Sequence, residues 1–234
     1  MTSVKTIPCS LRTHTTPGLG RRRALVIAFA SAAGAVGPIA RGQGRPTGGT
    51  DANTDVRPYL QVKPVPGEED VVRVFFSPHC AYSRQYMGFF GNLQRTLPTR
   101  KRFEYSTLIN RGDGLPYALA FETVRQHYPG YLTNFVKVSM DAVQDRQVPI
   151  RTWRGIDAIG KAAQVPESLA RLVATNARQA AVAAQLSIRR QGALSVTNTP
   201  SVAIAGTYIV TPEFTNGDAA VFSQLVNGLI SMTI

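Results

Sequence analysis

The chain has 234 residues, enough for one domain, or one domain with an insertion, around a sizeable core. Its 26 Lys and Arg outnumber its 14 Asp and Glu, which gives a formal net charge of +12. Five of the basic residues and no acidic one lie in the first 40 residues, and no dense basic run with interleaved aromatic residues follows. The composition therefore argues against nucleic-acid binding, and the few His and Cys residues are too scattered to predict a metal site.

The N-terminal segment has the features of an export signal. Arg21-Arg22-Arg23 precede an Ala-rich apolar stretch, Ala24 to Ala33, and Ala33-Gly34-Ala35 resembles a signal-peptide cleavage site. The apolar stretch is too short, and too interrupted by Gly and Pro, for a transmembrane helix. We therefore predict that residues 1–40 are a bacterial signal peptide, with Arg22-Arg23 also compatible with the twin-arginine route. The predicted location is the periplasm or cell surface; an uncleaved N-terminal membrane anchor is the alternative.

Residues 41–58 are rich in Gly, Thr, Asn and Pro without apolar periodicity, which predicts a flexible lead-in. The chain contains two cysteines, Cys9 and Cys80, and Cys9 lies within the predicted signal peptide. The mature protein would therefore have one thiol and no internal disulfide. Without the predicted signal peptide it is also expected to have no stable membrane insertion.

A strand, a turn and a helix are predicted around Cys80. The run Val71 to Phe76 is mostly β-branched and aromatic, as in a buried strand, and it ends at Ser77-Pro78. A thiol at such a strand-to-helix turn lies close to free backbone N–H groups and to the positive end of the helix dipole. Both favour the thiolate, the form that attacks disulfides. The alternative is a buried, unreactive cysteine.

Apolar spacing and proline breaks predict the remaining elements. A helix follows Ser83 and ends at Pro98, and a strand follows near residues 103–109. Five helical segments are predicted next, at 117–128, 131–144, 152–164, 167–174 and 176–191. A hairpin at 201–205 and 207–211 turns at Gly206, and a helix over 219–230 closes the chain. Trp153 is expected to pack in the core or at a domain interface.

Three motifs, in this order, resemble the thioredoxin superfamily and within it the DsbA-type thiol:disulfide oxidoreductases. They are the strand-like stretch Tyr59 to Val65, the run from Phe75 through Cys80-Ala81-Tyr82-Ser83, and Val196 to Pro200 before the hairpin. The resemblance implies an α/β thioredoxin-like fold with an inserted all-helical domain. Residues 59–116 and 192–234 would form the two parts of the thioredoxin-like domain, and residues 117–191 the helical insertion.

The resemblance also implies roles for individual residues. Pro200 corresponds to a cis-proline that faces the nucleophile Cys80, and Thr199 and Tyr82 lie where the family binds an extended substrate peptide. His79 precedes the nucleophile, where it could stabilise the thiolate or remain an exposed spectator. Ser83 stands at the position of the second, resolving cysteine, so the motif is an atypical C-x-x-S.

A further departure and an ambiguity accompany this motif. Val74 stands where many DsbA-type enzymes carry a buried glutamate, so two parts of the dithiol chemistry are missing together. Ser77-Pro78-His79-Cys80 also resembles a C-P-H-C motif that has lost its first cysteine. The interval between Phe75-Phe76-Ser77 and Cys80 favours Cys80 as the first position.

Three functions are compatible with these residues. The first is an exported monothiol oxidoreductase or isomerase that exchanges disulfides through Cys80, with an external thiol resolving the mixed disulfide. Its partners would be extended or unfolded cysteine-containing proteins of the periplasm and a redox partner protein. The second is a redox-inactive peptide-binding module, a chaperone or assembly factor. The third is a glutathione-dependent isomerase or transferase of the kappa type. No bound cofactor is predicted; glutathione enters the first hypothesis only as a candidate external thiol.

Overall fold

The structure is a computed structural model that describes residues 57–109 and 114–234. The described residues belong to one compact unit, residues 53–234. The predicted signal peptide, Cys9 and nearly all of the predicted lead-in lie outside the described residues. Within the described ranges, no helix has both the length and the apolar character needed to cross a membrane.

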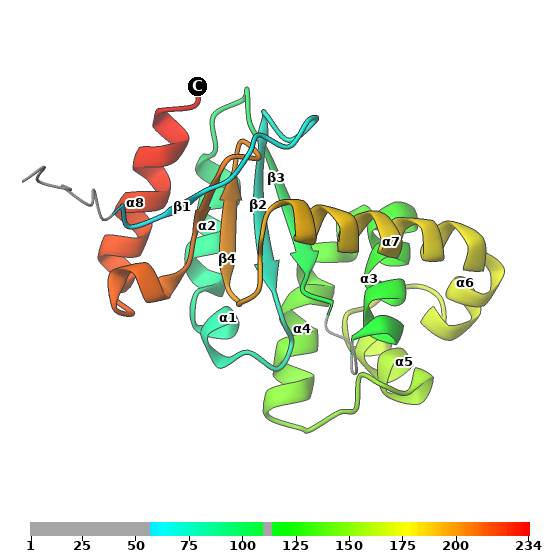
Figure 1. The fold of residues 1–234 in the computed structure, drawn as a ribbon. Helices are drawn as coiled ribbons and strands as arrows, with labels where there is room; N and C mark the ends of the chain where they lie inside the picture. The colour runs from blue at the N-terminus through cyan, green and yellow to red at the C-terminus, as the bar shows by residue number, and fades with distance from the viewer. Residues whose placement is uncertain (1–56, 110–113) are drawn as a thin grey trace, which may run out of the picture. The chain divides into compact units, whose positions relative to one another are not determined.

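A five-stranded sheet forms the centre of the fold (Figure 1). Its strands are β1 (Leu60–Gln61), β2 (Val71–Phe76), β3 (Arg102–Thr107), β4 (Ser201–Ile204) and β5 (Tyr208–Val210), in the order β1-β5-β4-β2-β3. β2 pairs with β3 in parallel and with β4 antiparallel, so Val74 lies opposite Tyr105 on one side and Val202 on the other. All six residues of β2 are buried, because this central strand is covered by apolar side chains on both faces of the sheet.

A different cluster of apolar side chains packs on each face of the sheet. Val72, Val74 and Phe76 of β2 belong to the main core. Helices α2 (Met87–Thr96) and α8 (Ala219–Ser231) pack against this core through Phe90 and Phe222. Phe75, which points to the opposite face, belongs to a smaller cluster with Leu194 and Val196 from the segment that precedes β4. Side chains therefore alternate between faces along β2, as expected for a central strand.

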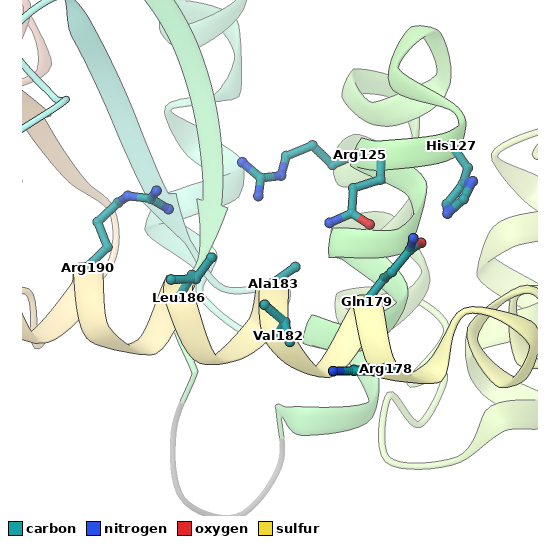
Figure 2. A pocket seen from close by; sticks show the side chains of 9 residues that line it. Arg125, His127, Arg178, Gln179, Val182, Ala183, Leu186 and Arg190 are labelled. Atoms are coloured by element: carbon teal, nitrogen blue, oxygen red, sulfur yellow. The ribbon is translucent and has the colours of Figure 1, made fainter.

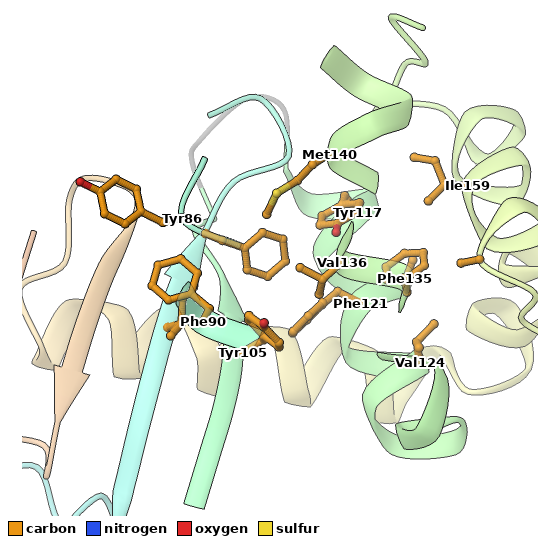
Figure 3. Close-up of a cluster of buried hydrophobic side chains, with 14 of the residues drawn as sticks. Tyr86, Phe90, Tyr105, Tyr117, Phe121, Val124, Phe135, Val136, Met140 and Ile159 are labelled. Carbon is orange, nitrogen blue, oxygen red and sulfur yellow. The ribbon is translucent and has the colours of Figure 1, made fainter. Parts of the chain in front are cut away.

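Five α-helices and a short 3-10 helix lie between β3 and β4 in the chain. They are α3 (Leu115–His127), η1 (Pro129–Tyr131), α4 (Leu132–Gln144), α5 (Trp153–Ala162), α6 (Leu169–Thr175) and α7 (Ala177–Ala193). Figure 1 shows the α-helices gathered beside β3. Figure 3 shows Phe121, Phe135 and Met140 of this group in one cluster with Phe90 and Tyr105. The predicted class, a thioredoxin-like α/β fold with a helical insertion, is confirmed.

Two details differ from the sequence-based expectation. The segment after Cys80 forms two helices instead of one, because the chain bends at Tyr86 between α1 (Ala81–Gln85) and α2. Trp153 is not a core residue: it begins α5 and is 37% exposed.

A buried ion network connects the sheet to the helices, and the sequence analysis missed it. Arg73 of β2, only 1% exposed, donates to both carboxylate oxygens of Glu68 at 2.9 Å. Its Nη1 lies 2.8 Å from Oε2 of Glu104 in β3. On the α7 side, the Nε of Arg190 pairs with Glu68 at 2.7 Å. On the α3 side, Arg125 contacts Glu104 at 3.5 Å.

Candidate active site

Cys80 is the N-cap residue of α1. Its backbone is extended (φ −85°, ψ 114°), and its Sγ accepts a hydrogen bond from the N–H of Ser83 at 3.4 Å. The turn before it closes with a hydrogen bond from the Cys80 N–H to the Ser77 carbonyl at 3.0 Å. Pro78, which has no N–H to satisfy, fits inside this turn. The free thiol is half-buried and adjoins the exposed N–H groups of the first helical turn.

Cys80 meets the segment before β4 across the site. The peptide bond between Thr199 and Pro200 is cis, and the Cys80 thiol donates to the Thr199 carbonyl oxygen at 3.0 Å. The loop is held from behind, since Ser201 Oγ donates to the Asn198 carbonyl at 2.6 Å. The structure thus brings together two residues that are 119 positions apart in the chain.

Ser83 lies beneath the thiol and is completely buried. Its hydroxyl accepts a long hydrogen bond, 3.4 Å, from the N–H of Ser77. The side chain therefore supports the turn that precedes Cys80. A hydroxyl in this position cannot form or reduce a disulfide, unlike the thiol that the family pattern has there.

A groove of about 310 Å³ lies beside the cis-proline. Tyr82, Asn198, Thr199 and Pro200 contribute to its lining from one side, and residues 211–213, 216 and 217 complete it. Tyr82 is 57% exposed. Such an open, partly aromatic surface next to backbone carbonyl groups suits an extended peptide. Of the predicted substrate-binding residues, all three line this groove.

His79 is exposed and precedes the thiol in the turn. Its backbone N–H donates to the Ser77 hydroxyl at 3.4 Å. Among the described residues, the imidazole ring has no hydrogen-bond partner. Within the described part of the chain, the ring therefore makes no hydrogen bond to the Cys80 sulfur.

Charged and polar residues that the sequence analysis missed surround α1. Arg84 donates to both carboxylate oxygens of Asp145, at 2.6 and 2.7 Å. These hydrogen bonds lower the pKa of Asp145 and raise the pKa of Arg84. The amide of Gln144 also reaches the active-site turn. No sequence signal marks Gln144 and Asp145, because they are ordinary polar types that lie far from the Cys80 turn in the chain, Gln144 by 64 residues.

A second and larger hollow, about 680 Å³, lies between α3 and α7 (Figure 2). Arg125, His127, Arg178 and Arg190 contribute basic groups, and Val182 and Leu186 form exposed apolar surface between them. None of the predicted site residues lines this hollow. Arg125 and Arg190 are already paired with glutamates of the buried network. The hollow is therefore separate from the candidate active site.

The described residues contain no group of three or more His, Cys, Asp or Glu side chains that could hold a metal ion. The chemistry that this site offers is that of one thiol at a helix N-terminus, a facing backbone carbonyl and an adjacent peptide-sized groove.

Comparison with known proteins is informative at the level of structure. No family model and no curated protein matches the chain. Solved structures of DsbA proteins do match. DsbA from Klebsiella pneumoniae aligns with a TM-score of 0.61 at 15% identity, covering 75% of this chain and 94% of that protein. DsbA from Xylella fastidiosa aligns with a TM-score of 0.58 at 19% identity, covering 74% and 94%.

A third structure, a cysteine-to-serine variant of Proteus mirabilis DsbA with a non-covalently bound peptide, aligns with a TM-score of 0.63 at 14% identity. The alignment covers 76% of this chain and 96% of that protein. At these identities the likeness establishes the shared fold. The function has to be argued from the residues of the site.

Proposed function

We propose that this chain is an exported protein that catalyses thiol–disulfide exchange in the periplasm through a single nucleophile, Cys80. The observation that carries the proposal is the position of its sulfur, 3.0 Å from the Thr199 carbonyl and beside the cis bond to Pro200. A nucleophile placed here contacts Thr199, which lines the groove in which an extended substrate would lie. The likeness to DsbA structures, one of them with a bound peptide, supports the same chemistry.

The reaction needs one thiol in the protein and one outside it. The Cys80 thiolate attacks one sulfur of a substrate disulfide; a new S–S bond forms, and the second substrate sulfur leaves as a thiolate that takes a proton from water. A low-molecular-weight thiol such as glutathione then attacks the mixed disulfide on the substrate sulfur. This step restores the Cys80 thiolate and leaves the substrate joined to the external thiol. Each step exchanges one disulfide for another, so no oxidant is consumed.

The serine at position 83 is the reason that an external thiol is required. In a dithiol enzyme the second cysteine attacks the mixed disulfide from within the protein. Here the residue at that position is a buried serine, which cannot make this attack. The Cys80 mixed disulfide should therefore persist until a free thiol arrives.

The rate of Cys80 alkylation tests the proposal. In a Cys9→Ser background Cys80 is the only thiol, so its reaction with iodoacetamide can be followed by mass spectrometry across pH. We expect native protein at neutral pH to react about tenfold faster than the same chain unfolded in urea, because the Ser83 N–H donates to Sγ and would stabilise the negative charge on the attacking sulfur. Pro200→Ala should change the rate, and Cys80→Ser should abolish labelling. A native thiol that reacts no faster than the unfolded one would overturn the proposal.

Ser83→Cys supplies a second test within the same experiment. The substitution adds a thiol below Cys80, where the Ser83 N–H already contacts Sγ. With an oxidised peptide as substrate, the variant should release the reduced peptide without any external thiol and form an internal disulfide. The parent chain should instead accumulate the mixed disulfide. Equal behaviour of the two proteins would contradict the role assigned to the serine.

The groove beside Pro200 favours a second candidate function, a module that holds extended peptides without redox chemistry. Its surface includes the exposed ring of Tyr82 and needs no thiol for binding. Peptide affinity that is unchanged in Cys80→Ser, together with an unreactive wild-type thiol, would favour this function over exchange.

A further inference from the structure

The last turn of α4 lies against the active-site turn. Gln144, the final residue of α4, donates from Nε2 to the carbonyl oxygen of Pro78 at 2.9 Å and to that of Cys80 at 3.1 Å. Both partners are carbonyl oxygens, which only accept hydrogen bonds. The side chain must therefore present its NH₂ group, and the two protons of that group are enough for the two oxygens.

Apart from the bond of the Cys80 N–H to the Ser77 carbonyl and the long bond of the Ser77 N–H to the Ser83 hydroxyl, the turn has few hydrogen bonds. Pro78 has no N–H, and the His79 N–H makes only a long bond of 3.4 Å to the Ser77 hydroxyl. Within the described residues, Gln144 is the only donor to the Pro78 carbonyl, and Pro78 is buried. A buried carbonyl without a partner is unfavourable, so this bond selects the observed conformation of the turn.

The same turn of α4 also holds the other end of α1. The bidentate pair of Arg84 with Asp145 is accompanied by a contact of 3.2 Å to Asp141. Arg84 is 39% exposed, so the pair adds little stability, but its two parallel hydrogen bonds fix an orientation. Side chains at the end of α4 thus hold both the turn that precedes α1 and the last turn of α1.

We propose that Gln144 is a positioning residue of the candidate active site, which holds the Cys80 backbone so that Sγ contacts the carbonyl of Thr199, a residue that lines the groove. This inference rests on the proposed function. The contact between the Cys80 sulfur and the Thr199 carbonyl joins two separate segments, so a shift of the turn moves the sulfur relative to a bound substrate. Disulfide exchange requires the reacting sulfurs to be aligned, and misplacement by about 1 Å can slow a reaction by two orders of magnitude.

The test compares two substitutions in the Cys9→Ser background. Gln144→Met keeps the length of the side chain and removes both donors. Gln185→Met, at an exposed position of α7, makes the same chemical change away from the site. The probe is a short peptide joined to glutathione by a disulfide, and the second-order rate of exchange with Cys80 is measured. We expect Gln144→Met to react about tenfold more slowly and the control to stay within about twofold of the parent.

Gln144→Glu separates positioning from simple packing. An ionised carboxylate only accepts hydrogen bonds and repels the two carbonyl oxygens, whereas the protonated acid regains one donor. The ratio of the parent rate to the variant rate should therefore rise with pH as the new carboxyl group ionises. The charged groups around the turn, His79, Arg84, Asp141 and Asp145, are common to both proteins. Each rate is expressed per Cys80 thiolate, titrated separately in the parent and the variant, so that a direct effect of the new charge on the thiol does not enter the ratio. A loss of packing alone would give a ratio that does not vary with pH.

The outcomes distinguish this inference from the proposed function. If Gln144→Met exchanges within about twofold of the parent, the positioning role is wrong. If the parent itself does not react with the probe, the proposed function fails. The inference is then decided by amide hydrogen exchange at residues 79–81, which should be faster in Gln144→Met than in the parent. Unchanged exchange at these amides would overturn it.

Discussion

Two tyrosines of the main core differ in how their hydroxyl groups are satisfied. The Tyr117 hydroxyl shares a hydrogen bond of 2.7 Å with Ser139. The Tyr105 hydroxyl is buried and has no hydrogen-bond partner among the described residues. Burial without a partner is unfavourable by about 1–3 kcal/mol, so the two side chains contribute differently to stability although both rings pack against Phe76.

Removing the two hydroxyl groups, one at a time, should therefore have different effects on the unfolding free energy. We expect Tyr105→Phe to be neutral or to stabilise the protein by up to about 1 kcal/mol at about pH 8, because no hydrogen bond is lost. Tyr117→Phe should destabilise it by about 1 kcal/mol, because the buried Ser139 oxygen loses the hydrogen bond from Tyr117 and keeps only its own bond to the Val136 carbonyl. Urea unfolding gives both values.

The same pair predicts a loss of stability in alkali. Burial raises the pKa of Tyr105 to about 12 from an ordinary value of 10.0, and it raises the pKa of Tyr117 further. A raised pKa means that the folded state keeps its proton while the unfolded state loses it. The contribution is therefore complete below pH 10.0 and declines as pH rises toward about 12. The unfolding free energy of Tyr105→Phe should therefore fall less between about pH 8 and ~10.5 than that of the parent. An equal fall in the two proteins would contradict this assignment.

At the residue scale, short motifs locate part of the site. The strand-to-helix turn indicates Cys80, and the resemblance to DsbA-type proteins indicates Thr199 and Pro200; the structure brings all three together. Gln144 and Arg84 could not be found in this way. Their contacts to the site depend on how α4 packs against α1, and nothing in a single Gln or Arg on a helix indicates its long-range partner.

At the scale of elements, β2 illustrates what an apolar pattern misses. Its six residues were predicted as a buried strand, but Arg73 in the middle carries a charge into the interior. The side chain lies on the same face as Phe75, and Glu68 and Glu104 neutralise it there. The sequence contained the signal, a charged residue within an apolar run, but not the partners, which come from a loop and from β3.

Substitution of Arg73 should be far more damaging than substitution of an exposed arginine on the next strand. Arg73→Met would leave Glu68 and Glu104 partly uncompensated in the interior, and we expect a loss of about 3 kcal/mol in unfolding free energy. Arg102→Met is the matched control. Arg102 is 57% exposed and pairs with Asp70 at 2.8 Å, so its loss should change stability by less than about 1 kcal/mol. Similar losses for the two variants would show that the network does not stabilise the fold as argued.

Most other elements could be predicted because their signals are local. The five predicted helical segments match α3 to α7 with ends that differ by at most a few residues, since prolines and polar caps mark where they stop. The hairpin turns at Gly206, which has φ +64°. The bend at Tyr86 was not predicted. Its cause is tertiary: the Tyr86 ring packs on Phe222 of α8, and its hydroxyl donates to the Gly217 carbonyl at 3.2 Å.

At the scale of the whole described unit, the sheet and the helical insertion share one core. The main cluster contains Val74 and Phe90 from the sheet and its flanking helix together with Phe121, Phe135 and Ile159 from the insertion (Figure 3). The buried ion network crosses between the same two parts through Glu104 and Arg125. The sequence indicated an insertion, but not whether it would fold separately, because the pattern of apolar residues does not identify which faces meet.

A shared core predicts that both parts unfold together. Trp153 is the only tryptophan of the chain and lies in the helical insertion, so its fluorescence reports on that part. A fluorophore attached to Cys80, in the Cys9→Ser background, reports on the thioredoxin-like part. We expect the two signals and far-ultraviolet circular dichroism to give the same urea midpoint, as in a two-state transition. Two separated midpoints would mean that the insertion is an independent folding unit, and they would contradict the shared core of Phe90, Phe121 and Phe135.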